Sequence, residues 1–217
     1  NEQQIRWLER FLKLRGIDSN ANCMCLIGYI GSRRQARRAK AEAGLIIGRF
    51  KGISAGKRMG NAWKKNRFRS AYLRNTLWDL GYAVDTLETA VNWDKVTDTM
   101  VRVEKGLEQA LDSVEEPILA FSHLSHVYAI GSSIYTTFVF RLADTPQKPL
   151  ERWRTLKQAA CRAIVAAGGT ISHHHGIGRD HLPYLEPEKG PIGIKTLHQV
   201  FNYLDPNRQM NPGKLLA

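Results

Sequence analysis

Three consecutive histidines stand well inside the chain, in the sequence ISHHHGIG, which spans Ile171–Gly178. Imidazole side chains titrate near neutral pH and serve as proton carriers and metal ligands. Adjacent imidazoles in one cleft would perturb one another, so His173, His174 and His175 indicate an acid–base site rather than a surface turn. The Gly-x-Gly that follows has two other interpretations, a simple turn or a set of backbone N–H groups that bind an anion.

Two further histidines and a tyrosine are candidates for the same site. His123 and His126 lie three residues apart in a predicted strand, so we expect them on opposite faces and only one of them near His174. A predicted hairpin brings Tyr135 into the same space, where it would act as acid, base or hydrogen-bond donor. A three-histidine zinc site fits these residues, but no HExxH or Cys-x-x-Cys motif supports it, and we expect no metal.

Arg74 is a candidate of a different kind. It stands in the sequence AYLRNTLWD, among aromatic and aliphatic residues. An arginine in apolar surroundings needs an anionic partner. That partner is either a substrate phosphate or carboxylate, held by two parallel hydrogen bonds, or an acid of the chain itself, Asp85 or Glu88.

The elements that position these residues follow from the spacing of the apolar side chains. The pattern predicts strands over 23–30, 82–91, 117–128, 132–142 and 170–172, and helices over 2–15, 33–47, 61–81 (two pieces that meet near residue 70), 94–114, 149–167 and 190–203. Ser32 and Asp94 are the predicted N-caps of the helices that follow them. This order indicates an α+β fold, with helices on one face of a mostly antiparallel sheet.

The chain has a net charge of +12, and residues 33–69, whose only acid is Glu42, carry the whole surplus of positive charge. Such a segment favours an anionic partner: nucleic acid, acidic lipid or a phosphorylated small molecule. The basic residues also fall at helical spacing, so the alternative is that they form the solvent-exposed face of a helix and bind no partner. Nucleic acid is the least favoured partner, because the aromatic residues near this segment show no stacking pattern on strands.

Cysteines and apolar runs bear on the compartment. The three cysteines, Cys23, Cys25 and Cys161, lie in apolar segments, which indicates buried thiols and a reducing compartment. No apolar run approaches the roughly 20 residues of a membrane helix, and the first residues do not resemble a signal peptide. We therefore expect a cytoplasmic protein, with the basic segment as a candidate contact with a membrane surface.

Four segments of the chain resemble one known family. They are RFRSAYLRNTLWDLGYAVDTLETAVNW, HVYAIGSSIYTTFVFR, GGTISHHHGIGRDHLPYLEPEKG and YLDPNRQMNPGKLL. Together they resemble the C-terminal half of alkylglycerone-phosphate (alkyl-dihydroxyacetonephosphate) synthases, which are FAD-linked oxidases of the vanillyl-alcohol oxidase type. The last segment is shared with the wider group that includes glycolate, lactate and hydroxyglutarate dehydrogenases.

This resemblance implies a ferredoxin-like C-terminal domain over 1–217 that covers the flavin ring and binds substrate. FAD would be bound mainly by an N-terminal domain that is absent from this chain, and the chain alone would be inactive. The implied reaction exchanges the acyl group of acyl-dihydroxyacetone phosphate for a fatty alcohol, in ether-lipid synthesis. The implied partners are a phosphorylated lipid-like substrate, the FAD domain of the same parent chain and a second copy in a homodimer.

The resemblance also implies catalytic residues. Tyr135 matches the catalytic tyrosine of the family, and His173, His174 and His175 match its active-site histidines. In the dehydrogenase branch the position of His174 is usually a carboxylate and that of Tyr135 a histidine, both in a metal site. The residues here differ at both positions, which argues against a metal.

Binding residues follow in the same way. Arg74 matches the arginine beside the flavin and the substrate phosphate, and Asn211 matches an asparagine that approaches the flavin. His175 is a further expected flavin contact. An FAD-linked 2-hydroxyacid dehydrogenase or oxidase is the alternative function, and a basic nucleic-acid-binding module is a remote one.

Overall fold

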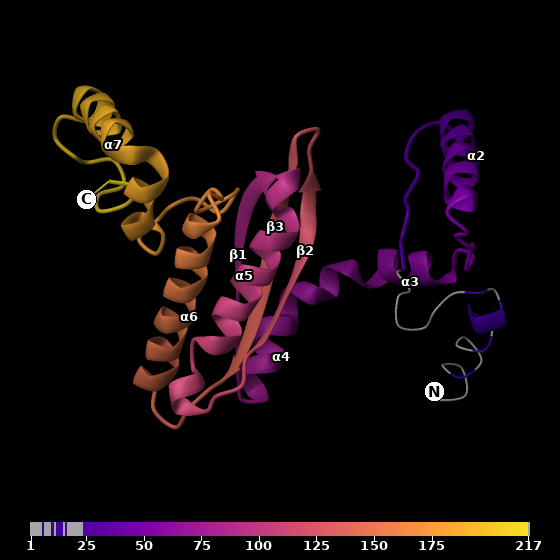
Figure 1. Cartoon of the computed structure of the whole chain (residues 1–217), viewed down its shortest axis with the longest axis horizontal. Helices are drawn as coiled ribbons and strands as arrows, with labels where there is room; N and C mark the ends of the chain where they lie inside the picture. The colour runs from indigo at the N-terminus through magenta and orange to yellow at the C-terminus, as the bar shows by residue number, and fades with distance from the viewer. Residues whose placement is uncertain (1–5, 7–9, 11, 15, 17–23, 217) are drawn as a thin grey trace. The chain divides into compact units, whose positions relative to one another are not determined.

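The computed structural model describes residues 6, 10, 12–14, 16 and 24–216, and the chain divides into two compact units, Asn1–Ala71 and Tyr72–Ala217 (Figure 1). The predicted helix over 2–15 falls largely outside the described residues, and so does Cys23. No helix in the described part of the chain is long and apolar enough to cross a membrane.

The first unit contains α2 (Arg33–Arg49) and α3 (Arg58–Asn66). The predicted cap of α2 is confirmed: Ser32 Oγ accepts from the Gln35 backbone N–H, and the Gln35 side chain accepts from the Ser32 N–H. This reciprocal pair satisfies two of the free N–H groups at the helix start. A 3-10 turn, Arg67–Tyr72, then leads to α4 (Leu73–Asp79), which agrees with two helical pieces that meet near residue 70.

The predicted strand over 23–30 is wrong for its described part. Residues 24–30 are irregular, and nearly all of them are exposed. A strand needs a neighbouring strand for its backbone N–H and C=O groups, and an apolar run does not specify that neighbour. For the same reason Cys25 is exposed rather than buried, whereas Cys161 is buried as expected.

The second unit is built on a three-stranded antiparallel sheet in the order β1-β3-β2. The strands are β1 (Tyr82–Asn92), β2 (Leu119–Val127) and β3 (Gly131–Arg141). They confirm the three predicted strands and the hairpin between the second and the third. The chain therefore has the expected α+β architecture with an antiparallel sheet.

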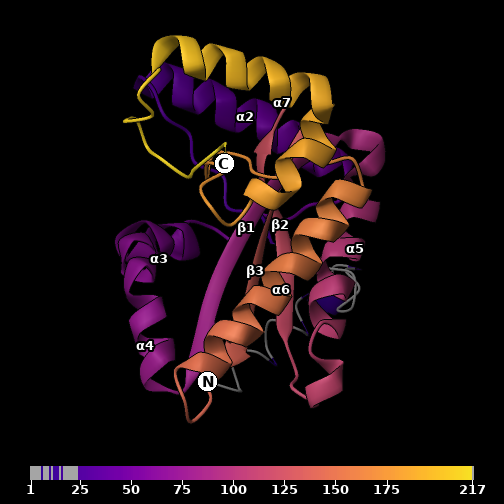
Figure 2. The same cartoon turned by 90° about the vertical axis from the view of Figure 1, so that its left-hand side faces the viewer.

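Helices α5 (Val96–Gln109) and α6 (Gln147–Ala166) cover one face of this sheet, and α4 lies on the opposite side, against β1 (Figure 2). The covered face carries the core, which includes Leu87, Val103, Leu107, Ile134, Phe138, Leu156 and Ile164. Each such side chain contributes roughly 1.5–3 kcal/mol by its burial. Asp94 does not cap α5: it lies in a 3-10 turn, Trp93–Lys95, and Lys95 is the N-cap, without a side-chain hydrogen bond.

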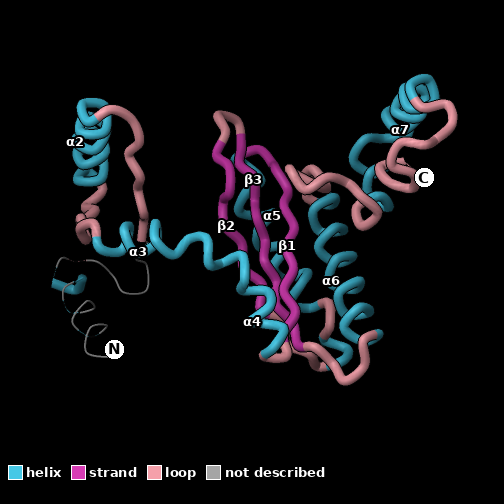
Figure 3. The backbone as a smooth tube through the Cα atoms, turned by 180° about the vertical axis from the view of Figure 1, so that it is seen from behind, coloured by secondary structure: helices cyan, strands magenta, loops and turns pink. Residues whose placement is uncertain are grey.

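The opposite face of the sheet, here called the open face, carries the polar side chains. In the strand register Glu88 stands beside Tyr135, and Tyr135 stands beside His123, so these three residues share a face. Thr86 and Ser133, each two positions away on its strand, face the same side. Figure 3 shows the sheet from this side, with α5 behind it and α6 next to β1.

After α6 the chain returns along the free edge of β1. Thr170 N–H donates to the Ala90 carbonyl (3.2 Å), and His173 N–H donates to the Glu88 carbonyl (2.9 Å). The predicted strand over 170–172 does not form, because the Ile171 N–H between these two bonds donates to the Glu188 carboxylate (2.6 Å) instead. Helix α7 (Leu185–Leu204), which carries Glu188, is kinked at Gly190.

Candidate active site

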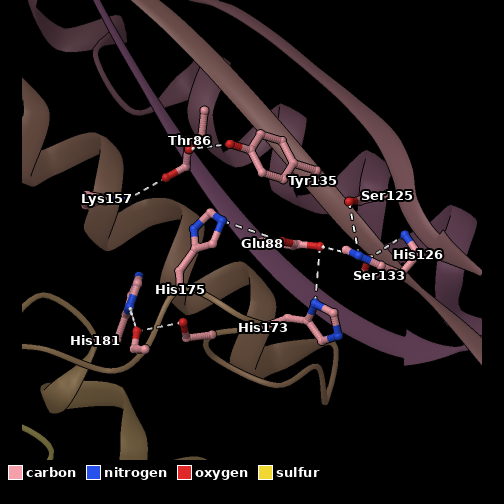
Figure 4. A network of polar contacts seen from close by, with 12 residues as sticks. Thr86, Glu88, Ser125, His126, Ser133, Tyr135, Lys157, His173, His175 and His181 are labelled. Carbon is pink, nitrogen blue, oxygen red and sulfur yellow. Dashed lines mark hydrogen bonds and ion pairs between the residues drawn. The ribbon is translucent and has the colours of Figure 1, made fainter. Parts of the chain in front are cut away.

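The centre of the polar cluster is Glu88, whose side chain is almost completely buried on the open face. Its Oε1 lies 3.2 Å from His173 Nδ1 and 3.3 Å from His126 Nδ1, and its Oε2 lies 3.5 Å from His175 Nε2 (Figure 4). A single carboxylate thus faces three imidazoles, two of them from the histidine triplet. Sequence reasoning considered Glu88 only as a partner for Arg74.

Hydrogen bonding keeps Glu88 ionised. Burial by itself raises the pKa of this carboxyl, but hydrogen bonds from Ser133, His173 and His126 outweigh it and leave the pKa below its ordinary value. At neutral pH Glu88 is therefore a buried carboxylate that can only accept hydrogen bonds. It holds a negative charge under the imidazole rings and favours protons on the nitrogens that face it.

His126 joins this cluster because β2 contains a β-bulge. The register pairs Leu124 with Ile134 and then Val127 with Ser132, so β2 advances three residues while β3 advances two. The extra residue places His126 on the open face, where its Nδ1 lies 3.2 Å from Ser133 Oγ. The prediction that His123 and His126 point to opposite faces is therefore wrong, because it assumed a regular strand.

A tight turn at His174 arranges the triplet. His175 N–H donates to the His173 carbonyl (2.8 Å), and His174 between them has a φ of 62°. This is a three-residue turn with its central residue in the left-handed region, which is rare for a residue other than glycine. The turn lets His173 and His175 both approach Glu88, while His174 stacks on His126 with 4.8 Å between ring centroids.

Tyr135 lies beside the triplet, as expected from the predicted hairpin. Its ring meets His175 edge-on, with 5.5 Å between centroids, and lies 5.2 Å from His123. Its hydroxyl donates to Thr86 Oγ1 (3.0 Å). A phenol held by its neighbour and flanked by two imidazoles can exchange a proton with a group bound on the open face.

Tyr128 is a residue that sequence reasoning missed. Its hydroxyl lies 3.0 Å from His173 Nε2, on the side of the ring opposite to Glu88. It directly follows β2, two residues after His126. The sequence offered one indication that Tyr128 belongs to the site: an aromatic residue at the end of a predicted strand that carries histidines.

Two predicted site residues do not join the cluster. Arg74 lies on α4 with two thirds of its side chain exposed, donates to the Val84 carbonyl (3.2 Å) and lies 3.6 Å from Asp85 Oδ1. The prediction that Arg74 has apolar surroundings is therefore wrong, because α4 leaves the guanidinium in solvent beside Asp85 of β1. Asn211 is exposed in the C-terminal tail, which contacts the loop after the triplet through Leu215 N–H and the Gly178 carbonyl (3.4 Å).

A metal ion is the alternative use of three of these histidines. Ligand nitrogens of His126, His173 and His174 lie within 4.8 Å of one another. However, both ring nitrogens of His173 already have hydrogen-bond partners, Glu88 and Tyr128. The geometry thus favours proton exchange, and the expected absence of a metal stays a prediction.

The sheet, its helices and this cluster define the class of protein. The family model for FAD linked oxidases, C-terminal domain, matches residues 1–215, and the chain belongs to this family of FAD-linked enzymes. A similar protein is "Alkyldihydroxyacetonephosphate synthase" of Caenorhabditis elegans, 29% identical over 194 residues, which covers 88% of this chain and 32% of that protein. The chain spans about a third of the length of the curated relatives that it matches.

A solved structure and a second relative complete the comparison. The structure "alkyldihydroxyacetonephosphate synthase in P212121" superposes with a TM-score of 0.53 at 19% identity, over 84% of this chain and 30% of that chain, which supports the fold. "D-lactate dehydrogenase [cytochrome], mitochondrial" of Arabidopsis thaliana is 44% identical over 89 residues, 41% of this chain and 15% of that protein.

FAD is the cofactor of this family. His126 and Tyr128 are 46% and 43% exposed on the open face, so ring-shaped side chains are presented outward over the buried charge of Glu88. Flat aromatic and imidazole rings pack well against a planar cofactor.

Proposed function

We propose that the chain is the substrate-binding part of an FAD-dependent alkyl transferase, which exchanges the acyl group of acyl-dihydroxyacetone phosphate for a fatty alcohol. The observation that carries the proposal is the buried Glu88 carboxylate beneath the histidine triplet, beside Tyr135. The relatives named alkyldihydroxyacetonephosphate synthase support this choice of reaction. A single C-terminal substrate domain over 1–217, next to an FAD domain, is part of the proposal.

The residues of the cluster have distinct roles in this reaction. When bound, FAD would supply an electrophilic ring system for the exchange. Tyr135 takes a proton from the substrate on its hydroxyl oxygen, and His175, next to Tyr135, takes the displaced phenolic proton. Glu88 stabilises the charged imidazole until the departing carboxylate removes that proton. No net oxidation is required of these residues.

The first test replaces Tyr135 by Phe in the intact flavoprotein. We expect loss of fatty-acid release from acyl-dihydroxyacetone phosphate by a factor of about 10² or more, because the phenolic proton is lost. The melting temperature should change little, since the ring and its contacts remain. Tyr203→Phe, at an exposed tyrosine of α7, is the matched control and should keep full activity. Near-normal turnover of Tyr135→Phe would remove its catalytic role.

The second test replaces Arg74 by Lys. In the proposed enzyme Arg74 holds the substrate phosphate, and a point charge cannot reproduce the two parallel hydrogen bonds of a guanidinium. We expect KM for the phosphorylated substrate to rise about tenfold, with kcat less affected. Arg102→Lys, on α5, is the control. An unchanged KM would mean that Arg74 serves only its pair with Asp85.

An FAD-linked 2-hydroxyacid dehydrogenase is the second candidate, and the similarity to a D-lactate dehydrogenase over 89 residues favours it. The two functions differ in what happens to the flavin. Steady reduction of the flavin by a 2-hydroxyacid would support the dehydrogenase. Release of fatty acid with no accumulation of reduced flavin would support the transferase. The anionic partner of residues 33–69 stays a prediction in either case.

A further inference from the structure

Glu88, His173 and Tyr128 form a continuous chain of hydrogen bonds from the buried side of the cluster to its exposed edge. Glu88 Oε1 lies 3.2 Å from His173 Nδ1, and His173 Nε2 lies 3.0 Å from the Tyr128 hydroxyl. The chain runs from a carboxylate that is 4% exposed to a tyrosine that is 43% exposed. It is separate from the contact between Tyr135 and His175.

The direction of these hydrogen bonds follows from the chemistry of the three groups. An ionised carboxylate has no proton to donate, so the bond to Glu88 requires a proton on His173 Nδ1. In the neutral ring the other nitrogen, Nε2, then carries a free lone pair. The Tyr128 hydroxyl is the donor that faces this lone pair. Glu88 thus selects one tautomer of His173, and this tautomer makes His173 a proton acceptor toward Tyr128.

The backbone of Tyr128 is held in place on both sides. Its N–H donates to the Gly131 carbonyl (2.8 Å), and its own carbonyl accepts from the indole N–H of Trp93 (3.1 Å). These two bonds fix the residue at the end of the hairpin, although its side chain is partly in solvent. A fixed and accessible phenol next to a basic nitrogen is suited to proton exchange with a bound hydroxyl.

We propose that Glu88, acting through His173, makes Tyr128 a second proton-exchanging group of the site, distinct from Tyr135, for a substrate that carries an alcohol hydroxyl. Tyr128 passes its proton to His173 Nε2 and takes the proton of the alcohol, whose O–H bond breaks as the oxygen becomes a nucleophile. The proton remains on the imidazole, opposite the Glu88 carboxylate, until the departing carboxylate removes it and restores the neutral ring. Nothing is oxidised or reduced. The alcohol substrate and its transfer rest on the proposed function, whereas the tautomer of His173 does not.

Glu88 is therefore a positioning residue, and its effect is visible without substrate. In the protein labelled with ¹⁵N-histidine, we expect the neutral His173 ring to carry its proton on Nδ1. In Glu88→Gln the side-chain amide can donate to Nδ1, so the proton should move to Nε2; Glu88→Asp, which keeps the charge, should preserve the original tautomer. Tyr128→Phe, which leaves Glu88 in place, should preserve it too. A wild-type ring protonated on Nε2 would overturn the proposal.

The kinetic test uses the intact flavoprotein and compares three tyrosines. We expect Tyr128→Phe to lower kcat for alkyl transfer about 10²-fold and to remove one ionisation from the pH–rate profile, while Tyr203→Phe changes neither. If Tyr128→Phe is fully active and Tyr135→Phe is not, the proposal fails but the proposed function stands. If both variants are fully active, the catalytic role of Tyr135 fails as well; only a wild-type flavoprotein with no alkyl transfer at all would contradict the proposed function. The tautomer measurement is independent of both results.

Discussion

Glu188 anchors the segment that precedes the histidine triplet, and its replacement gives a quantitative test of the structure. Its carboxylate accepts from the buried Ile171 N–H (2.6 Å) and from Thr170 Oγ1 (3.2 Å), and it pairs with the half-exposed Lys189 (2.6 Å). Ile171 is 1% exposed, so water cannot replace the lost acceptor. The position therefore combines a short charged hydrogen bond with a donor that has no alternative partner in the described part of the chain.

The magnitude follows from these contacts. A hydrogen bond to a charged group contributes about 1.5–3 kcal/mol, and the longer bond from Thr170 contributes about 0.5–1.5 kcal/mol. The exposed pair with Lys189 adds less than about 1 kcal/mol. We expect Glu188→Ala to lower the free energy of unfolding by about 2–4 kcal/mol. Glu188→Gln keeps an acceptor oxygen but loses the charge, so it should cost about half as much.

The dependence on pH separates this contact from a general packing effect. Burial raises the pKa of Glu188, but the bonds from Ile171, Lys189 and Thr170 outweigh it and lower the pKa from its ordinary 4.5. A carboxyl with a depressed folded pKa stabilises the protein above its unfolded pKa, and this stability is lost as the pH falls through the folded pKa. The gap between wild type and Glu188→Ala should therefore shrink below about pH 4.5.

Urea unfolding at pH 7 and pH 3, followed by tryptophan fluorescence, measures both effects. Glu186→Ala is the matched control: Glu186 is an exposed acid on the same helix, and its loss should change stability by less than about 0.5 kcal/mol. The reasoning is refuted if Glu188→Ala is no less stable than this control. It is also refuted if the gap to wild type is the same at both pH values.

Two other predictions concern the frame of the site. In Gly131→Ala the new methyl group would collide with the Val91 carbonyl and lie 3.0 Å from Asn92 Cα, so the free energy of unfolding should fall by about 2–3 kcal/mol or more. In Gly106→Ala the nearest atoms lie at an ordinary 3.7 Å, so the better helix propensity of alanine should raise the free energy of unfolding by about 0.5–1 kcal/mol. Thermal unfolding in parallel checks this order, and the opposite order would contradict it. Burial lowers the pKa of His181 from 6.5, so the unfolded state binds more protons and stability falls as the pH drops below 6.5. His181→Asn should flatten that dependence, and melting temperatures between pH 7 and pH 5 that decline as steeply as in wild type would refute it.

Strands and helices of the second unit were predictable because one face of each is buried. In β3 every second residue from Ser132 to Phe140 is buried against the helices, and this produces the alternation that the pattern detects. The run over 23–30 is also rich in apolar residues, yet its described part finds no partner strand. Composition indicates which segments are apolar, but whether such a segment forms a strand depends on the position of another strand with which it can pair.

The active-site candidates divide in the same way. The proximity of the triplet to Tyr135 was predictable because imidazole and phenol are suited to the same chemistry and because the hairpin that carries Tyr135 was predicted, although the strand expected over 170–172 does not form. Glu88 was not, because an acid in an alternating strand indicates a solvated face unless the residues that cover it are known. His126 was assigned to the wrong face because a β-bulge leaves no mark in the alternation of a single strand.

The β-bulge in β2 makes the cluster sensitive to the length of this strand more than to its composition. If β2 paired regularly after Leu124, Ser125 would stand opposite Ser133 and His126 opposite Ser132, which would turn the imidazole of His126 away from Glu88 with every histidine still present in the sequence. Substitutions at His126 remove one ring, whereas loss of the bulge rearranges the donors around the shared carboxylate. Variation in loop and strand length is therefore a route by which this scaffold can acquire or lose a proton-exchanging site.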